Sequence, residues 1–509
     1  MLRALIPAAL LCHLFTGPCL ASSWTQYRGS NQYGHYRGAI RTNWTAEAPR
    51  VLWRTPMPNG LSSFSVADGR LFTMGARRIS NEDRELVIAL NAESGAEIWA
   101  TVIDVADYPN GGVGTDDGTR STPTVDGGRV YGFGAYMNLV CLNATNGSTM
   151  WSNNLVAEFG ARIIPWENAA SPTVVGELVF VNCNGRANEH LLAFNKHSGA
   201  VVWRRGSFGM THATPVRANI HGVEQIVFFG QTALVGVNPT NGVVLWSYPL
   251  RYNGTSVAAS PVVVGDTVYI SRAYPGSLSS PQAGALVVQI TETNGVFTAA
   301  KKWEKVNQLL NHWATPVHVN GHYYGVYGQS TLTLRCVDAE DGDNPWQVSG
   351  VGYGSVTRVG DLLLVLSDRG DLSLVEPNPQ QHVEIDRIRP LTGRCWNNPA
   401  ISDGRIYIRS TTEAVALDVS LPNTNPPPPL KVGIAQLTAG SFNFEISAED
   451  GSAIDSSRAA GIGVYTRSDL SASGVWTRVT NSTVLSNGKL TLQVNASVPQ
   501  SYFRTEAPE

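Results

Sequence analysis

The sequence predicts an all-β protein, an eight-bladed β-propeller followed by a small C-terminal β-sandwich module. Three observations predict it. A glycine turn followed by a tryptophan recurs along most of the chain, and Gly (50) and Pro (28) are frequent among the 509 residues. Short β-rich stretches also recur at a mean spacing of about 48 residues, and four short strands in such a period are typical of a propeller blade. Because turns are frequent, the sequence argues against a fold built from long helices.

The first repeated signature is a hairpin that carries a tryptophan. Six apolar runs end in a polar residue and a glycine, and five have Asn or Asp four residues before that glycine. The Asx residue is expected to open a turn and the glycine to take a positive φ. A Trp follows four residues after five of the glycines and eight residues after Gly295. We expect these rings, and Trp53 described below, to pack against the neighbouring blade: Trp53, Trp99, Trp151, Trp203, Trp246, Trp303 and Trp346.

The second signature is a Ser/Thr-Pro step before two β-rich stretches separated by a glycine turn. Clear copies begin at Thr122-Pro123, Ser171-Pro172, Ser260-Pro261 and Thr315-Pro316. Weaker copies start near Ser65, Thr214, Thr357 and Asn398. The copies number eight, which predicts eight blades.

Closure of the ring is predicted from the two ends of the repeat. The eighth copy, with RIYIRS and AVALDVS, has no following Trp strand, whereas an early segment, PRVLWRT, carries Trp53. We expect this segment to complete the eighth blade, because closure removes open sheet edges. The seventh blade has no Trp, and HVEIDRIRP is its expected outer strand.

Four segments organise the chain. Residues 1–21 read as a secretory signal peptide with a short apolar core, which predicts an exported protein that is periplasmic, secreted or on the cell surface. Residues 22–420 form the propeller, 421–430 a proline-rich linker and 431–509 the all-β module. No later apolar run is long enough for a transmembrane helix.

The composition argues against several classes of protein. The net charge of −3 argues against nucleic-acid binding, and 15% charged with 43% apolar residues argues against disorder. The four cysteines after residue 21 form no C-x-x-C motif, so we interpret them as small buried hydrophobic residues. We expect a monomer.

The repeat from Thr122 to Trp151 resembles the pyrroloquinoline quinone (PQQ) repeat of quinoprotein alcohol dehydrogenases and of the non-catalytic propeller of the outer-membrane assembly machinery. WTQYRG (24–29), DDGTRSTPTV (116–125), NHWATPV (311–317) and GRCWNNPAISDGRIYIR (393–409) are similar to a group of secreted bacterial PQQ-like propellers. The resemblance covers roughly residues 24–420. It implies the fold, whereas fold and activity separate readily.

The resemblance also implies PQQ and calcium as ligands to consider. Catalytic members stack the quinone between a Trp and a disulfide of adjacent cysteines, hold Ca²⁺ with carboxylates and amides, and use an Asp as base. No two cysteines are adjacent here, and the closest acid–amide pair is Glu167-Asn168. We therefore assign no catalytic residue and no metal ligand. The acidic segments at Asp116-Asp117 and 338–343 could attract calcium, but the second occupies a repeat turn and is better explained as solvated.

Candidate binding residues lie just before the first strand of each blade, where connecting loops meet at one face of the channel. They are Arg120, Trp166, Glu167, Asn168, His212, His312, Trp313, Trp396 and Asn397, with Ser63, Phe64, Ser256 and Ser355 beside them. This mixture suits a polar or sugar-like ligand or a peptide loop. The alternative is that these side chains only fill the channel and satisfy backbone groups. His212 and His312, assigned to blades three and six, do not make a metal site by themselves.

These observations leave three functions open. The leading hypothesis is a non-catalytic binding or scaffold protein for a protein or polysaccharide partner. The alternatives are a PQQ- and calcium-dependent dehydrogenase of alcohols or sugars, and an outer-membrane assembly factor.

Overall fold

The computed structural model describes residues 24–106, 118–250, 257–273 and 283–421, and in the C-terminal part 430–438, 441–455, 458–459, 462–467, 477–478, 483–495 and 502–506. The chain divides into two compact units, Met1–Leu421 and Pro422–Glu509. The expected signal peptide, Asp116-Asp117, Ser256 and nearly all of the proline-rich linker lie outside the described residues.

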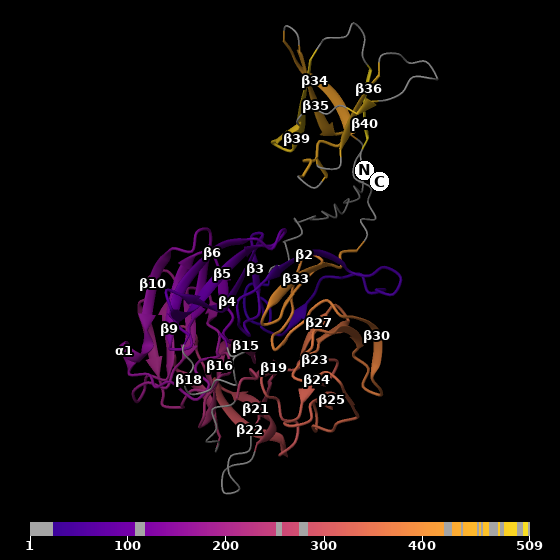
Figure 1. Ribbon diagram of the computed structural model, residues 1–509. Helices are drawn as coiled ribbons and strands as arrows, with labels where there is room; N and C mark the ends of the chain where they lie inside the picture. Colours follow the sequence, from indigo (N-terminus) through magenta and orange to yellow (C-terminus); the bar gives the residue numbers. More distant parts are fainter. Residues whose placement is uncertain are drawn as a thin grey trace, which may run out of the picture. The chain divides into compact units, whose positions relative to one another are not determined.

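The first unit consists of mainly antiparallel sheets arranged around a common centre (Figure 1). Eight sheets are present in the described residues of this unit, seven with four strands and one with five. In chain order they begin with β3–β6 (Ser65–Ala67, Arg70–Ile79, Glu82–Asn91, Glu97–Val105), β7–β10 (Thr124–Asp126, Arg129–Phe133, Asn138–Asn143, Thr149–Asn154), β11–β14 (Thr173–Val175, Leu178–Asn182, Leu191–Asn195, Val201–Arg205) and β15–β18 (Val216–Ile220, Val223–Phe229, Ala233–Val237, Val244–Pro249). They continue with β19–β22 (Val262–Val264, Thr267–Arg272, Gly284–Thr293, Val296–Val306), β23–β26 (Val317–Val319, His322–Tyr327, Thr333–Asp338, Trp346–Ser349), β27–β30 (Ser355–Val359, Leu362–Leu366, Leu372–Glu376, Val383–Ile388) and β31–β33 (Ala400–Ser402, Arg405–Arg409, Glu413–Asp418).

The prediction of an all-β propeller is confirmed, with one short helix, α1 (Leu155–Phe159), in the described part of this unit. The first strands of neighbouring sheets, which we call the inner strands, contact each other, and β3 of the first sheet contacts β31 of the last. The blade count of eight stays a prediction, which the eight described sheets support.

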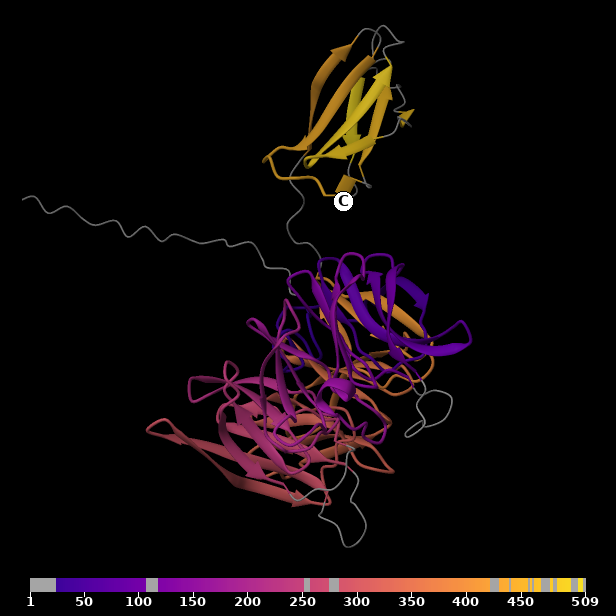
Figure 2. The ribbon, with the colours of Figure 1, turned by 90° about the vertical axis from the view of Figure 1, so that its left-hand side faces the viewer.

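The sheet of β31–β33 contains a strand from far earlier in the chain. β2 (Arg50–Pro56) pairs antiparallel with β33, and Trp53 lies opposite Ala416. In Figure 2 the orange strands of this sheet lie beside the indigo strands of the N-terminal region. A second early strand, β1 (His35–Tyr36), pairs parallel with β27 and makes that sheet five-stranded.

The hairpin turns connect each sheet to the one before it. Asn91 accepts from the backbone N–H groups of Glu93 and Ser94, and Gly95 closes the turn with φ +69°. The Trp53 indole N–H donates to the Ala92 carbonyl at 2.9 Å. The same indole-to-turn bond is made in five further sheets, by Trp99 to Ala144, Trp151 to Lys196, Trp203 to Pro239, Trp303 to Ala339 and Trp346 to Asn378.

Two tryptophans depart from this pattern, Trp303 in its spacing and Trp246 in its hydrogen bond. Trp303 follows Gly295 by eight residues because the β21–β22 hairpin is longer, yet its pairing with Val287 matches the pairing of Trp99 with Ala89. Trp246 donates to the Gln225 side chain of its own sheet at 2.6 Å instead of to the next turn.

The Ser/Thr-Pro steps form hydrogen bonds between neighbouring sheets. A backbone N–H before one sheet donates to the hydroxyl at the equivalent place before the next. These bonds join Asn398 to Ser63, Ser63 to Thr122, Thr122 to Ser171, Ser171 to Thr214, and Ser260 to Thr315. The repeated hydroxyl therefore holds the inner ends of successive sheets together.

The segment before β1 crosses the inner strands of many sheets. Its Gln32 amide donates to the Thr173 hydroxyl and the Pro215 carbonyl, at 2.9 and 3.0 Å. Its Arg28 is 1% exposed and donates to the carbonyls of Thr315 and Pro316. The early segment thus ties together sheets that are distant in sequence.

The second unit contains two antiparallel sheets, as predicted for a small β-sandwich. One has the order β34-β35-β39-β38 and the other β37-β36-β40. The bounds are β34 Leu430–Thr438, β35 Ser441–Ala448, β36 Gly463–Arg467, β37 Thr477–Arg478, β38 Thr483–Ser486, β39 Lys489–Asn495 and β40 Tyr502–Glu506.

The four cysteines of the described residues are free and buried. Burial raises the thiol pKa to about 12 in Cys141, Cys183 and Cys395, and to about 11 in Cys336. Such thiols remain protonated at neutral pH and are poor nucleophiles. None of the helices in the described part of the chain is long and apolar enough to span a membrane.

Candidate functional site

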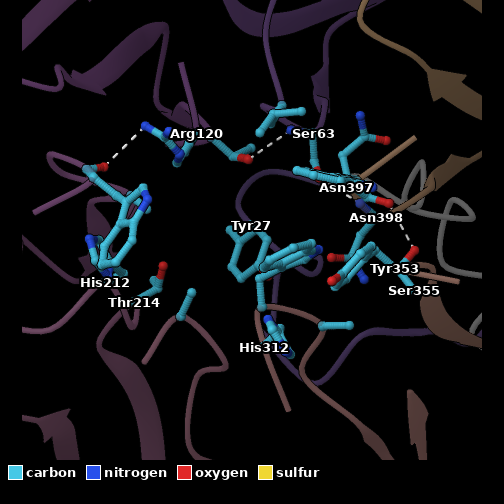
Figure 3. A pocket seen from close by; sticks show the side chains of 18 residues that line it. Tyr27, Ser63, Arg120, His212, Thr214, His312, Tyr353, Ser355, Asn397 and Asn398 are labelled. Carbon is cyan, nitrogen blue, oxygen red and sulfur yellow. Dashed lines mark hydrogen bonds between the residues drawn. The ribbon is translucent and has the colours of Figure 1, made fainter. Parts of the chain in front are cut away.

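A cavity of about 390 Å³ opens where the loops before the inner strands converge. We call it the axial pocket. It is drawn in Figure 3, and its lining residues are Tyr27, Leu61, Ser63, Arg120, Thr122, Trp166, Ala169, His212, Thr214, Ala258, His312, Trp313, Ala314, Tyr353, Ser355, Trp396, Asn397 and Asn398.

One side of the axial pocket consists of packed aromatic rings, which we call the aromatic wall: Trp313, Tyr353 and Trp396. Trp313 stacks on Tyr353 with ring centroids 4.7 Å apart and an interplanar angle of 24°. Trp396 lies 4.7 Å from Trp313 and carries the Arg394 guanidinium 4.4 Å from its own ring centroid. Mutual packing holds these rings in fixed orientations, as a preformed stacking surface requires.

Arg120 lies on another side, with Tyr27 drawn between it and Tyr353 (Figure 3). Arg120 donates to the Trp166 carbonyl at 3.0 Å and lies 3.7 Å from the buried Glu167 carboxylate. Trp166 and Glu167 have φ of +65° and +52°, a left-handed conformation that costs energy for residues other than glycine. At this strained turn Trp166 is 39% exposed, beside the cavity.

Both predicted histidines line the axial pocket, and each leads into the first strand of a sheet. His212 precedes β15, so it belongs to the fourth sheet and not to the third blade assigned from sequence. Its Nε2 lies 3.0 Å from the Pro165 carbonyl oxygen. His312 precedes β23 of the sixth sheet. Its ring contacts the aromatic wall edge-on, with the His312 and Trp313 ring centroids 5.1 Å apart. Burial lowers the His312 pKa to about 4, so its imidazole is neutral at pH 7.

The polar groups of the axial pocket differ in whether the fold already uses them. The hydroxyls of Ser63, Thr122 and Thr214 accept bonds between sheets, and the Ser355 hydroxyl donates to the Asn397 carbonyl at 2.8 Å. The Asn397 side chain is different. Asn397 is 4% exposed, and neither its amide oxygen nor its amide nitrogen has a hydrogen-bond partner in the described part of the chain.

Asn398, the next residue, shares this feature at its amide nitrogen. It is 5% exposed and its amide nitrogen also lacks a partner among the described residues. Adjacent buried amides that the fold leaves unused are costly, and they commonly mark a ligand or ordered water.

Three of the expected candidates do not line the axial pocket. Phe64 is buried in the core, and Glu167 is buried behind Arg120. Asn168 is used by the fold, because its amide nitrogen donates to Phe133 O and Ala170 O while its oxygen accepts from Ala170 N.

These contacts do not fit a calcium ion at Glu167-Asn168. The guanidinium of Arg120 faces the carboxylate, and the Asn168 oxygen already accepts a hydrogen bond. Within the residues that the structure describes, no group of three or more His, Cys, Asp or Glu side chains could hold a metal. The acidic turn at 338–343 carries ion pairs instead, from Lys302 to Glu340 and from Lys305 to Asp343.

Sequence reasoning missed Tyr27, which lines the centre of the axial pocket and belongs to the segment that crosses the inner strands. It also missed Tyr353. The only signal for Tyr27 was the WTQYRG stretch, whose position along the chain gives no indication that it reaches the axis.

Comparison with known proteins agrees with this architecture. Residues 83–348 match the family model described as "Outer membrane protein assembly factor BamB". Outer membrane protein assembly factor BamB of Yersinia pestis is 23% identical over 329 residues, which cover 62% of this chain and 74% of that protein.

Two solved structures share the fold at low sequence identity. Quinohemoprotein alcohol dehydrogenase from Comamonas testosteroni is 12% identical with a TM-score of 0.56, over 81% of this chain and 83% of that one. Quinohemoprotein alcohol dehydrogenase ADHIIG from Pseudomonas putida HK5 is 12% identical with a TM-score of 0.53, over 82% and 83%. Because the family match spans more than half of the sequence, this chain belongs to the PQQ-repeat propeller family that is described as outer membrane protein assembly factor BamB.

Proposed function

We propose that this protein is an exported, non-catalytic binding propeller that holds part of a partner in the axial pocket. The observation that carries the proposal is the pairing of the aromatic wall with the unpartnered Asn397 amide and Asn398 amide nitrogen in one concave site. Concave sites with aromatic surfaces and a few converging polar groups are typical of ligand binding.

The described residues give the dehydrogenase alternative little support. Glu167 and Asn168, the nearest acid–amide pair, are engaged with Arg120 and with backbone groups. The two alcohol dehydrogenases share the fold with this chain, and fold by itself does not imply activity.

Site-specific photocrosslinking tests the binding function. A benzoylphenylalanine placed at Tyr353, in the aromatic wall, should give a discrete adduct in the producing cells. Tyr33 is 42% exposed and does not line the axial pocket, so the same probe there is the control. We expect the Tyr353 adduct to disappear in a Trp313→Ala background. Adducts that are equal at both positions, or that persist without Trp313, would count against a pocket partner.

The second candidate is a role in outer-membrane protein assembly, favoured by the family match and by the Yersinia pestis relative. Under this hypothesis the partner is a protein of the outer-membrane assembly machinery. Deleting the gene should lower the amount of heat-modifiable, folded β-barrel protein in the outer membrane, and the wild-type chain should restore it. An unchanged amount of folded barrel protein after deletion would exclude this role.

A further inference from the structure

We infer that the axial pocket binds an uncharged sugar ring, which stacks on the aromatic wall and is hydrogen-bonded by the side chains of Asn397 and Asn398. This inference rests on the proposed binding function and names the chemical class of the ligand. It follows from the charge of the site, the shape of its apolar surface and the distribution of its unused polar atoms.

The charge of the axial pocket favours a neutral ligand. Of the described residues that line it, Arg120 is the one with a permanent charge, and no described carboxylate lines it. Arg120 is already compensated by Glu167, 3.7 Å away, whose side chain is fully buried. An anionic ligand would compete with that carboxylate, and a cationic ligand would meet Arg120 without an opposing charge.

The aromatic wall provides an apolar surface that is held in place before any ligand arrives. Trp313 and Trp396 are each partly exposed, and both line the cavity. Their mutual contact, together with Tyr353 and His312, fixes the ring planes. The C–H faces of a pyranose ring match such planes, because aromatic faces are electron-rich and sugar C–H groups are weakly positive.

The unused amides supply the complementary polar contacts. The Asn397 carboxamide offers one acceptor and two donor hydrogens, and the Asn398 amide nitrogen adds further donors. A pair of vicinal hydroxyls likewise presents both donors and acceptors. Ser63, Thr122, Thr214 and Ser355 contribute less, since their hydroxyls already make bonds within the fold.

The size of the site fits a small ligand. Its volume of about 390 Å³ lies near the lower end of small-molecule pockets, roughly 300–1,000 Å³. A single sugar unit at the end of a chain is therefore favoured over a folded peptide loop. A peptide loop also lacks the vicinal hydroxyls that a sugar presents.

The test is a titration of the full-length protein with methyl β-D-glucopyranoside, methyl α-D-galactopyranoside and N-acetylglucosamine. Concentrations up to about 20 mM cover the millimolar dissociation constants expected for one sugar unit. Saturation-transfer NMR and tryptophan fluorescence report binding. Glucuronate and tetramethylammonium are the anionic and cationic comparators, and a peptide rich in proline and tyrosine represents a protein loop.

We expect at least one neutral sugar to bind and the charged comparators to bind at least about tenfold more weakly. Asn397→Leu keeps the side-chain size and should weaken sugar binding by about tenfold, the amount expected for lost hydrogen bonds. Tyr353→Ala should also weaken it, whereas Tyr33→Ala, outside the axial pocket, should leave it unchanged. An unchanged melting temperature of Asn397→Leu would show that the variant is folded.

The outcomes separate this inference from the proposed function. Absence of binding by all three sugars, or sugar binding that Asn397→Leu and Tyr353→Ala leave intact, overturns the inference. Peptide binding at the axial pocket without sugar binding overturns it while the binding function stands. If the photocrosslinker at Tyr353 also captures nothing, both proposals fail.

Discussion

At the scale of single residues, the repeat depends on a glycine whose missing side chain makes room for a neighbour's tryptophan. Gly147 has φ +72°, and a Cβ there would lie 2.6 Å from the Trp99 ring. Gly95, Gly199 and Gly242 stand in the same relation to Trp53, Trp151 and Trp203. The turn glycine is therefore required twice, for its backbone conformation and for the space above the indole.

Gly147→Ala tests this double role. We expect a loss of about 2–4 kcal/mol in the free energy of unfolding, from left-handed strain plus overpacking against Trp99. Gly128 has φ +77° and open space around its Cβ position, so Gly128→Ala should cost only the strain, about 1–2 kcal/mol. Urea unfolding of both variants measures the difference. Equal losses would show that the space above Trp99 is not used.

His312 should make stability depend on pH. Its folded pKa of about 4 lies below the value of about 6.5 expected in the unfolded chain. Above about pH 6.5 both states are neutral and this contribution is complete; as the pH falls toward 4, the unfolded state binds the proton first and the contribution is lost.

The loss from this group amounts to ~3 kcal/mol across that window. His312→Gln should therefore flatten the pH dependence of the free energy of unfolding between about pH 6.5 and 4. NMR titration of the imidazole should give a pKa near 4. A titration near the ordinary value would contradict the burial of this side chain.

At the scale of elements, the N-terminal segment acts on the whole ring. β2 completes the sheet of β31–β33, and β1 extends the sheet of β27–β30. Between Trp24 and Tyr36 the chain also bonds to inner strands, so its contribution extends beyond one blade. The first and last sheets of the ring are not joined by a connecting loop, and these non-covalent contacts join them instead.

Arg28→Ala measures how much this segment stabilises the propeller. Burial lowers the pKa of Arg28 to about 10, and its guanidinium bonds to the carbonyls of Thr315 and Pro316. Removing it leaves buried carbonyls without donors and a cavity, so we expect a loss of about 3 kcal/mol or more. The exposed Arg37→Ala should change the free energy of unfolding by less than about 0.5 kcal/mol. Similar losses in the two variants would argue that Arg28 is not a stabilising link.

At the scale of the whole molecule, the two compact units have separate cores. The C-terminal unit has its own cluster of Ile446, Ile454, Ile462, Val464, Leu490 and Leu492. Within the first unit, apolar clusters lie between neighbouring sheets, for example Phe72 and Trp99 with Val130. Each sheet is therefore stabilised mainly by its neighbours, which favours cooperative unfolding of the closed ring.

A protease site inserted between Leu421 and Leu430 tests the independence of the two units. After cleavage, we expect the propeller to unfold in one transition at the same temperature as in the intact chain. Differential scanning calorimetry measures it. A shift of more than a few degrees would indicate that the units stabilise each other.

Much of the fold could be predicted because its signals are local. The Asx residue, the turn glycine and the Trp lie within one hairpin, so the hairpin at Gly147 is readable from a dozen residues. Gln225, which takes the indole bond of Trp246, gave no such signal, because that contact depends on side-chain packing within the sheet.

The candidate site was predicted only in part. Arg120, Trp166, His212, His312, Trp313, Trp396 and Asn397 line the axial pocket, since each lies just before an inner strand. Glu167 and Asn168 share that position in sequence but face the surrounding fold, because the left-handed turn at Trp166 reverses the chain there.

The sequence by itself determined the strands, the turns and the order in which they repeat, because alternation of apolar residues and turn chemistry act over a few neighbouring residues. Only the tertiary structure decided that Tyr27 reaches the axis, that the aromatic wall forms from three separate loops, and that Asn397 keeps its amide unused while the nearby hydroxyls do not. The physical reason is that closing the ring brings distant loops to one axis, where contacts between sheets use some polar groups and leave the Asn397 amide without a partner among the described residues.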